Sequence, residues 1–153
     1  TTLGDLVEMY KDHRPHHDTL EEGNKAPPLK AEDGRPAPEY VYMRRVHSRD
    51  GERYCVISIY IDRRVFRRAP KRFRRELALP ALTSLPGLSI ASAKQTLTIS
   101  TADMEIARLI GVPVNTPIAA VRRVLCTADG TVIYTAEVSY RGDYIHLEMD
   151  LKP

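Results

Sequence analysis

Residues 101–117 read TADMEIARLIGVPVNTP, and the chain then continues through strand-like sequence to AEVSYRGDYIHLEMDL at 136–151. The first stretch carries the signals of a short helix, because Thr101 or Asp103 can cap its start and Gly111 suits its end. The helix is expected to bury one apolar stripe, formed by Ile106, Ala107 and Ile110. This region therefore predicts one capped helix followed by β-structure.

Two strand-like segments follow this helix, at 118–126 and 132–140, with an Asp-Gly pair at 129–130 between them. Asp-Gly favours the tight turn of a β-hairpin. A further turn at 141–143 leads into 144–151, where apolar and polar residues alternate. Such alternation is typical of a strand with one buried face. The last third of the chain thus predicts three antiparallel strands.

The middle of the chain supplies three more strand signals. Segments 41–47 and 54–62 flank an Arg-Asp-Gly turn at 49–51, and a third strand is expected at 92–100. Helix-like sequence follows 54–62 and is expected to stop near Pro80. Because hairpins join most of the strands, we expect an α+β fold with an antiparallel sheet of about six strands and flanking helices.

The N-terminal segment lacks the strand signals of the rest of the chain. Residues 3–11 predict a short helix, and 12–38 form a polar stretch with five prolines, expected to be a loop over the domain or a linker. The chain is accordingly divided into 1–39, an N-terminal helix with a proline-rich covering loop or linker, and 40–153, the folded domain.

Composition limits the class of protein. The chain has 153 residues with 42% hydrophobic content, enough for one domain with a core. It has no run of about 20 apolar residues and no signal-peptide pattern at its start, so we expect a soluble, cytoplasmic protein without a membrane partner.

The chain begins with Thr, as a fragment of a longer protein would. Cys55 and Cys126 lie in apolar runs and are expected to be buried, reduced thiols. No zinc spacing or glycine-rich phosphate loop occurs, so neither a metal nor a cofactor is predicted.

The positive charge is concentrated in one place. The net charge is +3, yet residues 63–75 hold eight basic side chains and no acidic one. Outside this run, 15 basic side chains are outnumbered by 20 acidic ones. The run is interpreted as a solvated helix face that Phe66 and Phe73 anchor, with a contact to DNA phosphates or an anionic ligand as the alternative.

Two arginine doublets, at 44–45 and 122–123, lie inside strand-like sequence. Side chains alternate across a strand, so each doublet places one guanidinium on each face of the sheet. Arg45 shares a face with apolar neighbours, and Glu137 is a carboxylate among apolar and hydroxyl side chains. Two interpretations stay open. One is structural: an internal Arg–Glu ion pair, or strands near an edge of the sheet where both faces meet water. The other is a polar pocket in which Arg45, His47 and Glu137 orient a small anionic ligand.

Several motifs resemble one family. They are RVH at 45–47 before an Asp-Gly turn, ADMEIARLIGVP at 102–113, TP at 116–117, VRRV at 121–124 and EVSYRGDY at 137–144. In this order they resemble the effector-binding (UTRA) domain of GntR/HutC-type bacterial transcription regulators. The resemblance covers about residues 40–151.

The resemblance implies a chorismate-lyase-like fold, an effector pocket on the sheet and a homodimer. Carried over residue by residue, it places the effector-binding side chains at Arg45, His47, Ser58, Glu137 and Tyr144. The family pattern has a second arginine where this chain has His47. We therefore expect an anionic effector other than a typical sugar phosphate, such as a carboxylate.

The resulting expectation is a cytoplasmic sensing and dimerisation domain that catalyses nothing and reaches DNA only through a winged helix-turn-helix outside this chain. Two alternatives belong to other classes. One is an enzyme resembling chorismate lyase that acts on a small aromatic carboxylate, and the other is a nucleic-acid module acting through residues 63–75.

Overall fold

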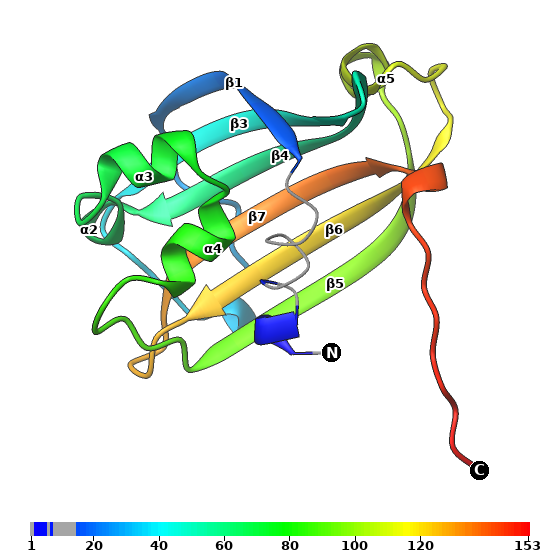
Figure 1. Ribbon diagram of the computed structural model, residues 1–153. Helices are drawn as coiled ribbons and strands as arrows, with labels where there is room; N and C mark the ends of the chain where they lie inside the picture. The colour runs from blue at the N-terminus through cyan, green and yellow to red at the C-terminus, as the bar shows by residue number, and fades with distance from the viewer. Residues whose placement is uncertain (1, 6, 8–14) are drawn as a thin grey trace.

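The computed structural model describes residues 2–5, 7 and 15–153. Its strands form one sheet in the order β1-β3-β4-β7-β6-β5, with the two-residue β2 beside β7 (Figure 1). Neighbouring strands are antiparallel except β2, which runs parallel to β7. The strands are β1 (His16–Asn24), β2 (Arg35–Pro36), β3 (Tyr40–Arg49), β4 (Glu52–Asp62), β5 (Ser92–Thr101), β6 (Pro117–Cys126) and β7 (Thr131–Arg141). The predicted antiparallel α+β fold is confirmed.

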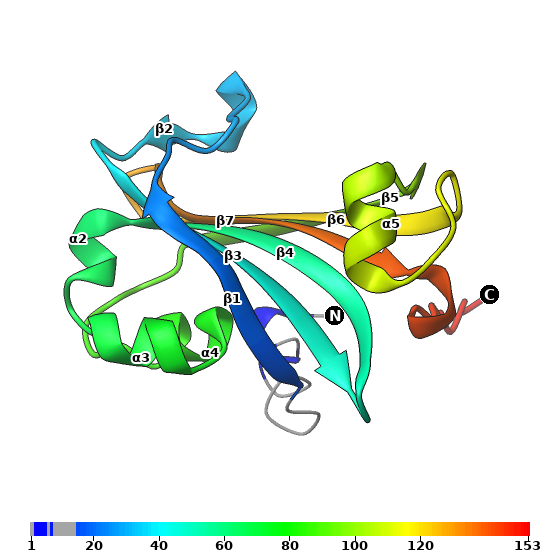
Figure 2. The ribbon, with the colours of Figure 1, turned by 90° about the horizontal axis from the view of Figure 1, so that it is seen from above.

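The helices divide between the two faces of the sheet. Figure 2 shows α2, α3 and α4 together on one face, and α5 and the segment before β3 on the other. The α-helices are α2 (Arg63–Phe66), α3 (Pro70–Arg75), α4 (Ala78–Thr83) and α5 (Met104–Ile110), and the 3-10 turns are η1 (Ala31–Asp33) and η2 (Gly142–Tyr144). The sequence suggested helix up to Pro80, whereas Pro80 lies inside α4. Proline is tolerated there because the first turn of a helix leaves its N–H groups unpaired.

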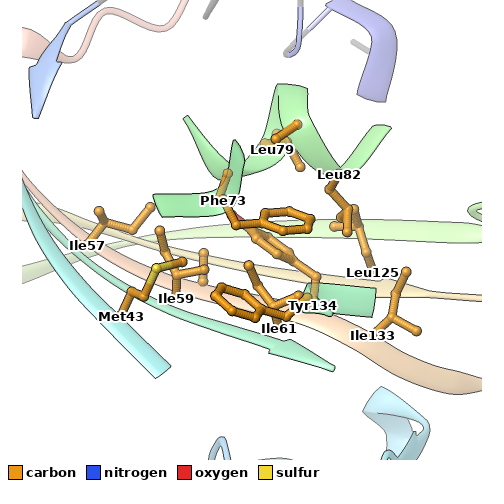
Figure 3. Packing of buried hydrophobic residues seen from close by; sticks show 14 of the residues in the cluster. Met43, Ile57, Ile59, Ile61, Phe73, Leu79, Leu82, Leu125, Ile133 and Tyr134 are labelled. Atoms are coloured by element: carbon orange, nitrogen blue, oxygen red, sulfur yellow. The ribbon is translucent and has the colours of Figure 1, made fainter. Parts of the chain in front are cut away.

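The larger core lies between the sheet and α2–α4. Figure 3 shows its aromatic and aliphatic side chains interlocking, with Phe73 above Tyr134. Phe73 and Ile61 are both fully buried, and burying a side chain of this size stabilises a fold by about 1.5–3 kcal/mol. A smaller core packs α5 on the opposite face and includes Val46, Val56, Ala107, Ile110 and Ile118.

The capped helix predicted from the sequence is present as α5. Asp103 is its N-cap, and its carboxylate accepts a hydrogen bond of 2.8 Å from the Ile106 amide. Gly111 ends the helix with φ of 69°, a left-handed conformation that glycine adopts without steric cost. Ala107 and Ile110 are buried as expected, while Ile106 is only partly so.

Two segments differ from the sequence-based expectation. Residues 16–24, expected to be loop, form β1 at the edge of the sheet, where hydrogen bonds to β3 define the strand although most of its side chains are exposed. Residues 144–151, expected to be a strand, are not one. Their alternating pattern suits a strand, but this part of the chain has no strand partner among the described residues. The predicted helix at 3–11 is helical at 3–5 and 7, and its remaining residues lie outside the described part.

Cys55 and Cys126 are free and buried, as predicted. Within residues 2–5, 7 and 15–153, no helix is long and apolar enough to span a membrane.

Candidate functional site

A cavity of about 500 Å³ lies on the sheet face opposite α2–α4, beside α5 and beneath residues 25–39, which connect β1 to β3 and are called the covering segment. This volume falls within the range of small-molecule sites. Its lining is mainly polar. Strands β3 to β7 supply the floor, η1 contributes Glu32 and Asp33 from above, and the start of α5 contributes Asp103.

The centre of the floor is one row of directly paired positions. Arg44 pairs with Ser58, Ser58 with Glu137, and Glu137 with Arg122 across adjacent antiparallel strands. The row ends at Thr96 on β5. Directly paired residues point to the same face and lie about 4.5–5.5 Å apart at Cβ. The register therefore places two guanidiniums on either side of one hydroxyl and one carboxylate.

Arg122 is held by the covering segment. Its two terminal nitrogens donate hydrogen bonds of 2.9 and 2.7 Å to the Asp33 carboxylate, and one also donates to the Pro28 carbonyl at 3.0 Å. Only 7% of the Asp33 side chain is exposed. The hydrogen bonds from Arg122 lower the pKa of Asp33 to about 2, so Asp33 is ionised at neutral pH.

Arg44 is held by α5. Its terminal nitrogen lies 2.5 Å from the Glu105 carboxylate, and 19% of the arginine side chain is exposed. The Arg44 Nε is buried and has no hydrogen-bond partner among the described residues. Each floor arginine thus pairs with a carboxylate from outside the sheet, and Arg44 retains an unused donor.

Several charged side chains of the cavity form no ion pair with the described residues, among them Lys30, Glu32, Lys94 and Glu137. Glu137 and Lys94 form no hydrogen bond or ion pair with the described residues, and Glu137 is exposed to the cavity. In total the lining contains four basic and four acidic side chains. The cavity is therefore polar and balanced in charge, with one free carboxylate near its centre.

The covering segment is fixed to the sheet at several points. Arg35 pairs with Thr131 of β7, and its amide donates to the Gly130 carbonyl at 2.8 Å. The Ala37 amide donates at 2.8 Å to the hydroxyl of Tyr40 in β3, which itself donates to the Val132 carbonyl at 2.7 Å. Gly34 has φ of 133°, and a Cβ there would lie 2.6 Å from the Gly130 oxygen. Glycine is required at this point because both the backbone angle and the space exclude a side chain.

The structure separates the predicted site residues. Ser58 and Glu137 lie on the cavity floor, whereas Arg45 and His47 point to the opposite face beneath α3 and α4. Arg45 is fully buried and forms no pair with Glu137. It donates instead to the Phe73 carbonyl, to the Glu76 carbonyl at 3.0 Å and to Thr19 Oγ1 at 3.3 Å. Two interpretations drawn from the sequence are therefore wrong. Arg45 and His47 do not share a pocket with Glu137, and Arg45 does not form an ion pair with Glu137.

Arg45 has a structural environment that the sequence did not indicate. Phe73 lies in the last turn of α3 and Glu76 is its C-cap. The carbonyl groups at a helix end lack partners within the helix and carry partial negative charge. The buried guanidinium of Arg45 satisfies two of these groups and ties α3 to β3.

His47 is buried beside Arg45, with 4% of the residue exposed. Burial, with the nearby His17, Arg45 and Arg123, lowers the pKa of His47 to about 3. The imidazole is therefore neutral at pH 7. Its ring centroid lies 6.3 Å from that of Tyr54 in an edge-on arrangement.

Tyr144 lies away from the cavity, in the 3-10 turn η2 that follows β7. Its ring stacks on Tyr54 with centroids 4.8 Å apart, and its hydroxyl donates to a Glu52 oxygen at 3.0 Å. Of the five predicted residues, the cavity therefore brings together only Ser58 and Glu137.

Sequence reasoning missed the arginines that do line the cavity. These are Arg44 and Arg122, the other members of the two doublets. When β4 and β7 are paired so that Ser58 lies opposite Glu137, the register of the neighbouring strands places Arg44 and Arg122 on the same face of the sheet as these two residues. No sequence signal indicated Asp33, because its role depends on how a proline-rich segment folds back over the sheet.

These features define a class: a single, mainly antiparallel sheet with α2–α4 on one face and, on the other, a polar cavity beside α5 that is suited to binding a small molecule. The UTRA domain family model matches residues 24–146. The chain therefore belongs to the UTRA family, and the resemblance seen in its motifs is confirmed. No curated protein sequence matches the chain.

Solved structures share the fold. The ligand-binding domain of a putative GntR-family transcriptional regulator from Bordetella bronchiseptica superposes with a TM-score of 0.73 at 22% identity, covering 91% of this chain and 90% of that one. The effector domain of PhnF from Mycobacterium smegmatis gives 0.75 at 19% identity, covering 100% and 98%. A possible transcriptional regulator, YydK from Bacillus subtilis, gives 0.75 at 15% identity. The match covers 92% of this chain but only 63% of YydK.

Proposed function

We propose that this chain is the effector-sensing domain of a GntR/HutC-type transcription regulator and that the effector binds in the cavity over the Arg44–Ser58–Glu137–Arg122 row. Family membership supports a regulatory, ligand-sensing role. The observation that carries the assignment of the site is the placement of a free carboxylate between two arginines whose counter-ions come from α5 and the covering segment.

The cavity chemistry favours an effector with both an acidic group and a hydrogen-bond donor. The guanidinium of Arg44 and the ammonium of Lys94 line the cavity and attract an anion. Glu137 is an acceptor and attracts an ammonium or hydroxyl group. A small carboxylate with amino or hydroxyl substituents satisfies both requirements, and it fits the sequence-based expectation of an anionic ligand.

The same contacts supply a way to transmit binding. Asp33 and Glu105 occupy the positions at Arg122 and Arg44 that an anionic ligand would take. A ligand that replaces either carboxylate removes one link between the sheet and the covering segment or α5, and so favours a state in which that element is less tightly held. The energy of ligand binding is thereby converted into movement of an element at the domain surface, because the ligand binds the released and tethered states differently.

A thermal-shift screen tests the proposal directly. The panel contains amino acids, hydroxycarboxylates, simple dicarboxylates and phosphate monoesters, each at matched ionic strength so that general salt effects are constant. We expect one chemical class to raise the melting temperature in a concentration-dependent way. Native mass spectrometry of freshly purified protein checks for a co-purifying small molecule.

Variants assign any ligand that is found to the cavity. Glu137→Gln and Ser58→Ala change the floor, and each is expected to weaken binding about tenfold, the loss of roughly 1.4 kcal/mol. Arg75→Ala is the control, because it alters an exposed arginine on α3, outside the cavity. Equal weakening by all three variants, or by none, would place the ligand elsewhere.

The proposal includes the absence of catalysis, a homodimer and DNA binding through another domain of a longer protein. The shared fold alone links the chain to chorismate lyase, and a fold does not carry chemistry. Release of 4-hydroxybenzoate from chorismate by the purified chain would contradict the non-catalytic role. A salt-dependent mobility shift with arbitrary DNA, lost when the cations of residues 63–75 are replaced, would assign nucleic-acid contact to this chain.

A further inference from the structure

The cavity floor contains a second row of paired residues beside the charged one. The charged row, Arg44–Ser58–Glu137–Arg122, is called the ionic row. Its neighbour on the side of α5 carries no charge and is called the neutral row. It consists of Val56, Ser139, Ala120 and Thr98, which pair directly across β4, β7, β6 and β5 and line the cavity. Because alternate residues of a strand lie about 6.5 Å apart, the floor changes from charged to uncharged within one such step.

Helix α5 adds an apolar side chain on the same side of the cavity. Ile106 lines the cavity and packs against the apolar cluster that includes Val56. It is only partly buried, although Ala107 and Ile110 of the same helix are buried. Ala120 of the neutral row is also partly exposed. The helix and the sheet therefore both present apolar surface to the cavity that the protein itself does not cover.

The polar groups on this side are neutral or already bonded. Ser139 and Thr98 supply hydroxyl groups from the floor. Asp103 lines the cavity at the start of α5, where its carboxylate accepts the hydrogen bond from the Ile106 amide. Lys94 lies beyond the ionic row, on the side away from the neutral row. A ligand group above the neutral row thus faces apolar carbon and hydroxyls, whereas one above the ionic row faces two guanidiniums.

This division favours a ligand with two unlike parts. Hydrocarbon placed against Ile106, Val56 and Ala120 leaves water and covers apolar protein surface, which strengthens binding about fourfold for each buried methylene. A charged group in the same place would lose its hydration without gaining a counter-ion. The acidic and donor groups of the ligand are therefore best placed on the ionic row, with an uncharged part toward α5.

We propose that the effector is a small amino or hydroxy acid with an uncharged hydrocarbon side chain, and that Ile106, Val56 and Ala120 select this side chain. The inference rests on the proposed sensing function and deepens it by naming the part of the effector that determines specificity. Dicarboxylates and basic amino acids are excluded, because their second charge would lie over the neutral row. The orientation also brings the hydrocarbon against α5, the helix that Glu105 links to Arg44.

A homologous series of probes tests the neutral row. The probes are alanine, 2-aminobutyrate, norvaline and norleucine with the matching 2-hydroxy acids, and calorimetry measures each affinity at constant ionic strength. We expect the affinity to rise about fourfold with each methylene until the space beside α5 is filled. Glutamate and lysine should bind at least tenfold more weakly than norleucine. Equal affinity along the series, a preference for the charged probes, or no binding by either series would overturn the inference.

Two substitutions change the size of this space in opposite directions. Ala120→Leu should weaken norleucine about tenfold and change the affinity for alanine less than twofold, because it fills the space from the floor. Ile106→Ala should shift the preference to a bulkier side chain such as that of phenylalanine. Met104→Ala is the matched control, because Met104 lies on the same helix, is 78% exposed and does not line the cavity. Uniform loss along the series in both cavity variants would reject these residues as selectors of the side chain.

Thermal melts without ligand check that each variant folds. Ala120→Val is the substitute if the larger leucine side chain prevents folding, and it should cause the same shift to shorter probes with a smaller amplitude. Ile106→Ala decides independently, because it removes atoms from the cavity wall and adds none.

Failure of this inference differs from failure of the sensing proposal. If a dicarboxylate or a phosphate monoester binds and Glu137→Gln weakens it, the cavity senses a small molecule and only the hydrocarbon assignment is rejected. If the norleucine series binds but Glu137→Gln and Ser58→Ala leave its affinity unchanged, the ligand lies outside the cavity and both proposals are rejected.

Discussion

Arg122 and Asp33 are 89 residues apart in sequence and are joined by two hydrogen bonds of 2.9 and 2.7 Å across the top of the cavity. The pair connects the sheet floor to the segment that covers it. Since both side chains are largely shielded from water, their interaction is stronger than that of an exposed ion pair. The same pair blocks one of the two floor arginines from an incoming anion.

Asp33→Asn is expected to separate the stabilising effect of this ion pair from its effect on anion binding. Loss of the charge-assisted hydrogen bonds should lower the free energy of unfolding by about 1.5–3 kcal/mol. The affinity for an anionic effector should rise, because Arg122 no longer has an internal counter-ion. Denaturant titration and calorimetry on the same variant measure both quantities. Asp50→Asn is the control, because Asp50 is exposed in the turn between β3 and β4 and does not line the cavity. A fall in affinity for Asp33→Asn would contradict counter-ion exchange.

Gly34→Ala tests whether the covering segment must lie where it does. A methyl group at this position would meet the Gly130 carbonyl at 2.6 Å while the backbone has φ of 133°. We expect a loss of about 1–3 kcal/mol from strain and faster hydrogen exchange in residues 25–38, with α2–α4 unchanged. Gly87→Ala is the matched control, because its φ is also positive at 75° but nothing lies within 4 Å of the added Cβ. Equal destabilisation of both variants would assign the effect to the backbone angle alone.

His47 should make the domain sensitive to acid. Its pKa is about 3 in the folded protein and about 6.5 when unfolded. The unfolded chain therefore binds the extra proton between these values, so stability is complete above about pH 6.5 and falls as the pH drops toward 3. One proton gives a slope of up to about 1.4 kcal/mol per pH unit. His47→Gln should flatten the denaturation profile between pH 6.5 and 4.5. Asp33 titrates lower, so its contribution falls outside this window. An unchanged slope would contradict burial of a neutral imidazole.

Local sequence signals predicted much of the fold. Asp-Gly turns fixed the β3–β4 and β6–β7 hairpins, and the capping residues fixed α5, because each depends on neighbours within a few residues. β1 was not predicted from the sequence because most of its side chains are exposed and therefore show no alternation of apolar and polar residues. Its strand structure depends on hydrogen bonds to β3. The segment at 144–151 shows the opposite case: a strand pattern is present but a partner within the described chain is not.

The candidate site was only partly predictable for a related reason. Alternation correctly indicated that each arginine doublet divides between two faces, but it could not show which face carries the cavity. Arg45 lies among apolar neighbours because its guanidinium binds carbonyl groups at the C-terminal end of α3. Arg44 is the arginine of this doublet that lines the cavity. Choosing between them required the position of α3 and the covering segment, which no local pattern encodes.

Arg45→Ala tests the assignment of this buried guanidinium. The substitution removes the donors to the Phe73 and Glu76 carbonyls and leaves a void beneath α3, so we expect the free energy of unfolding to fall by about 3 kcal/mol. Effector affinity should stay within about twofold, because Arg45 lies on the face opposite the cavity. Arg44→Ala is the matched control and should show the reverse balance, since it faces the cavity and 19% of its side chain is exposed. Thermal melts without ligand measure the loss of stability, and calorimetry with any effector found by screening measures the change in affinity. Weakened binding by Arg45→Ala with an unchanged melting temperature would return Arg45 to the effector site and contradict its role at the end of α3.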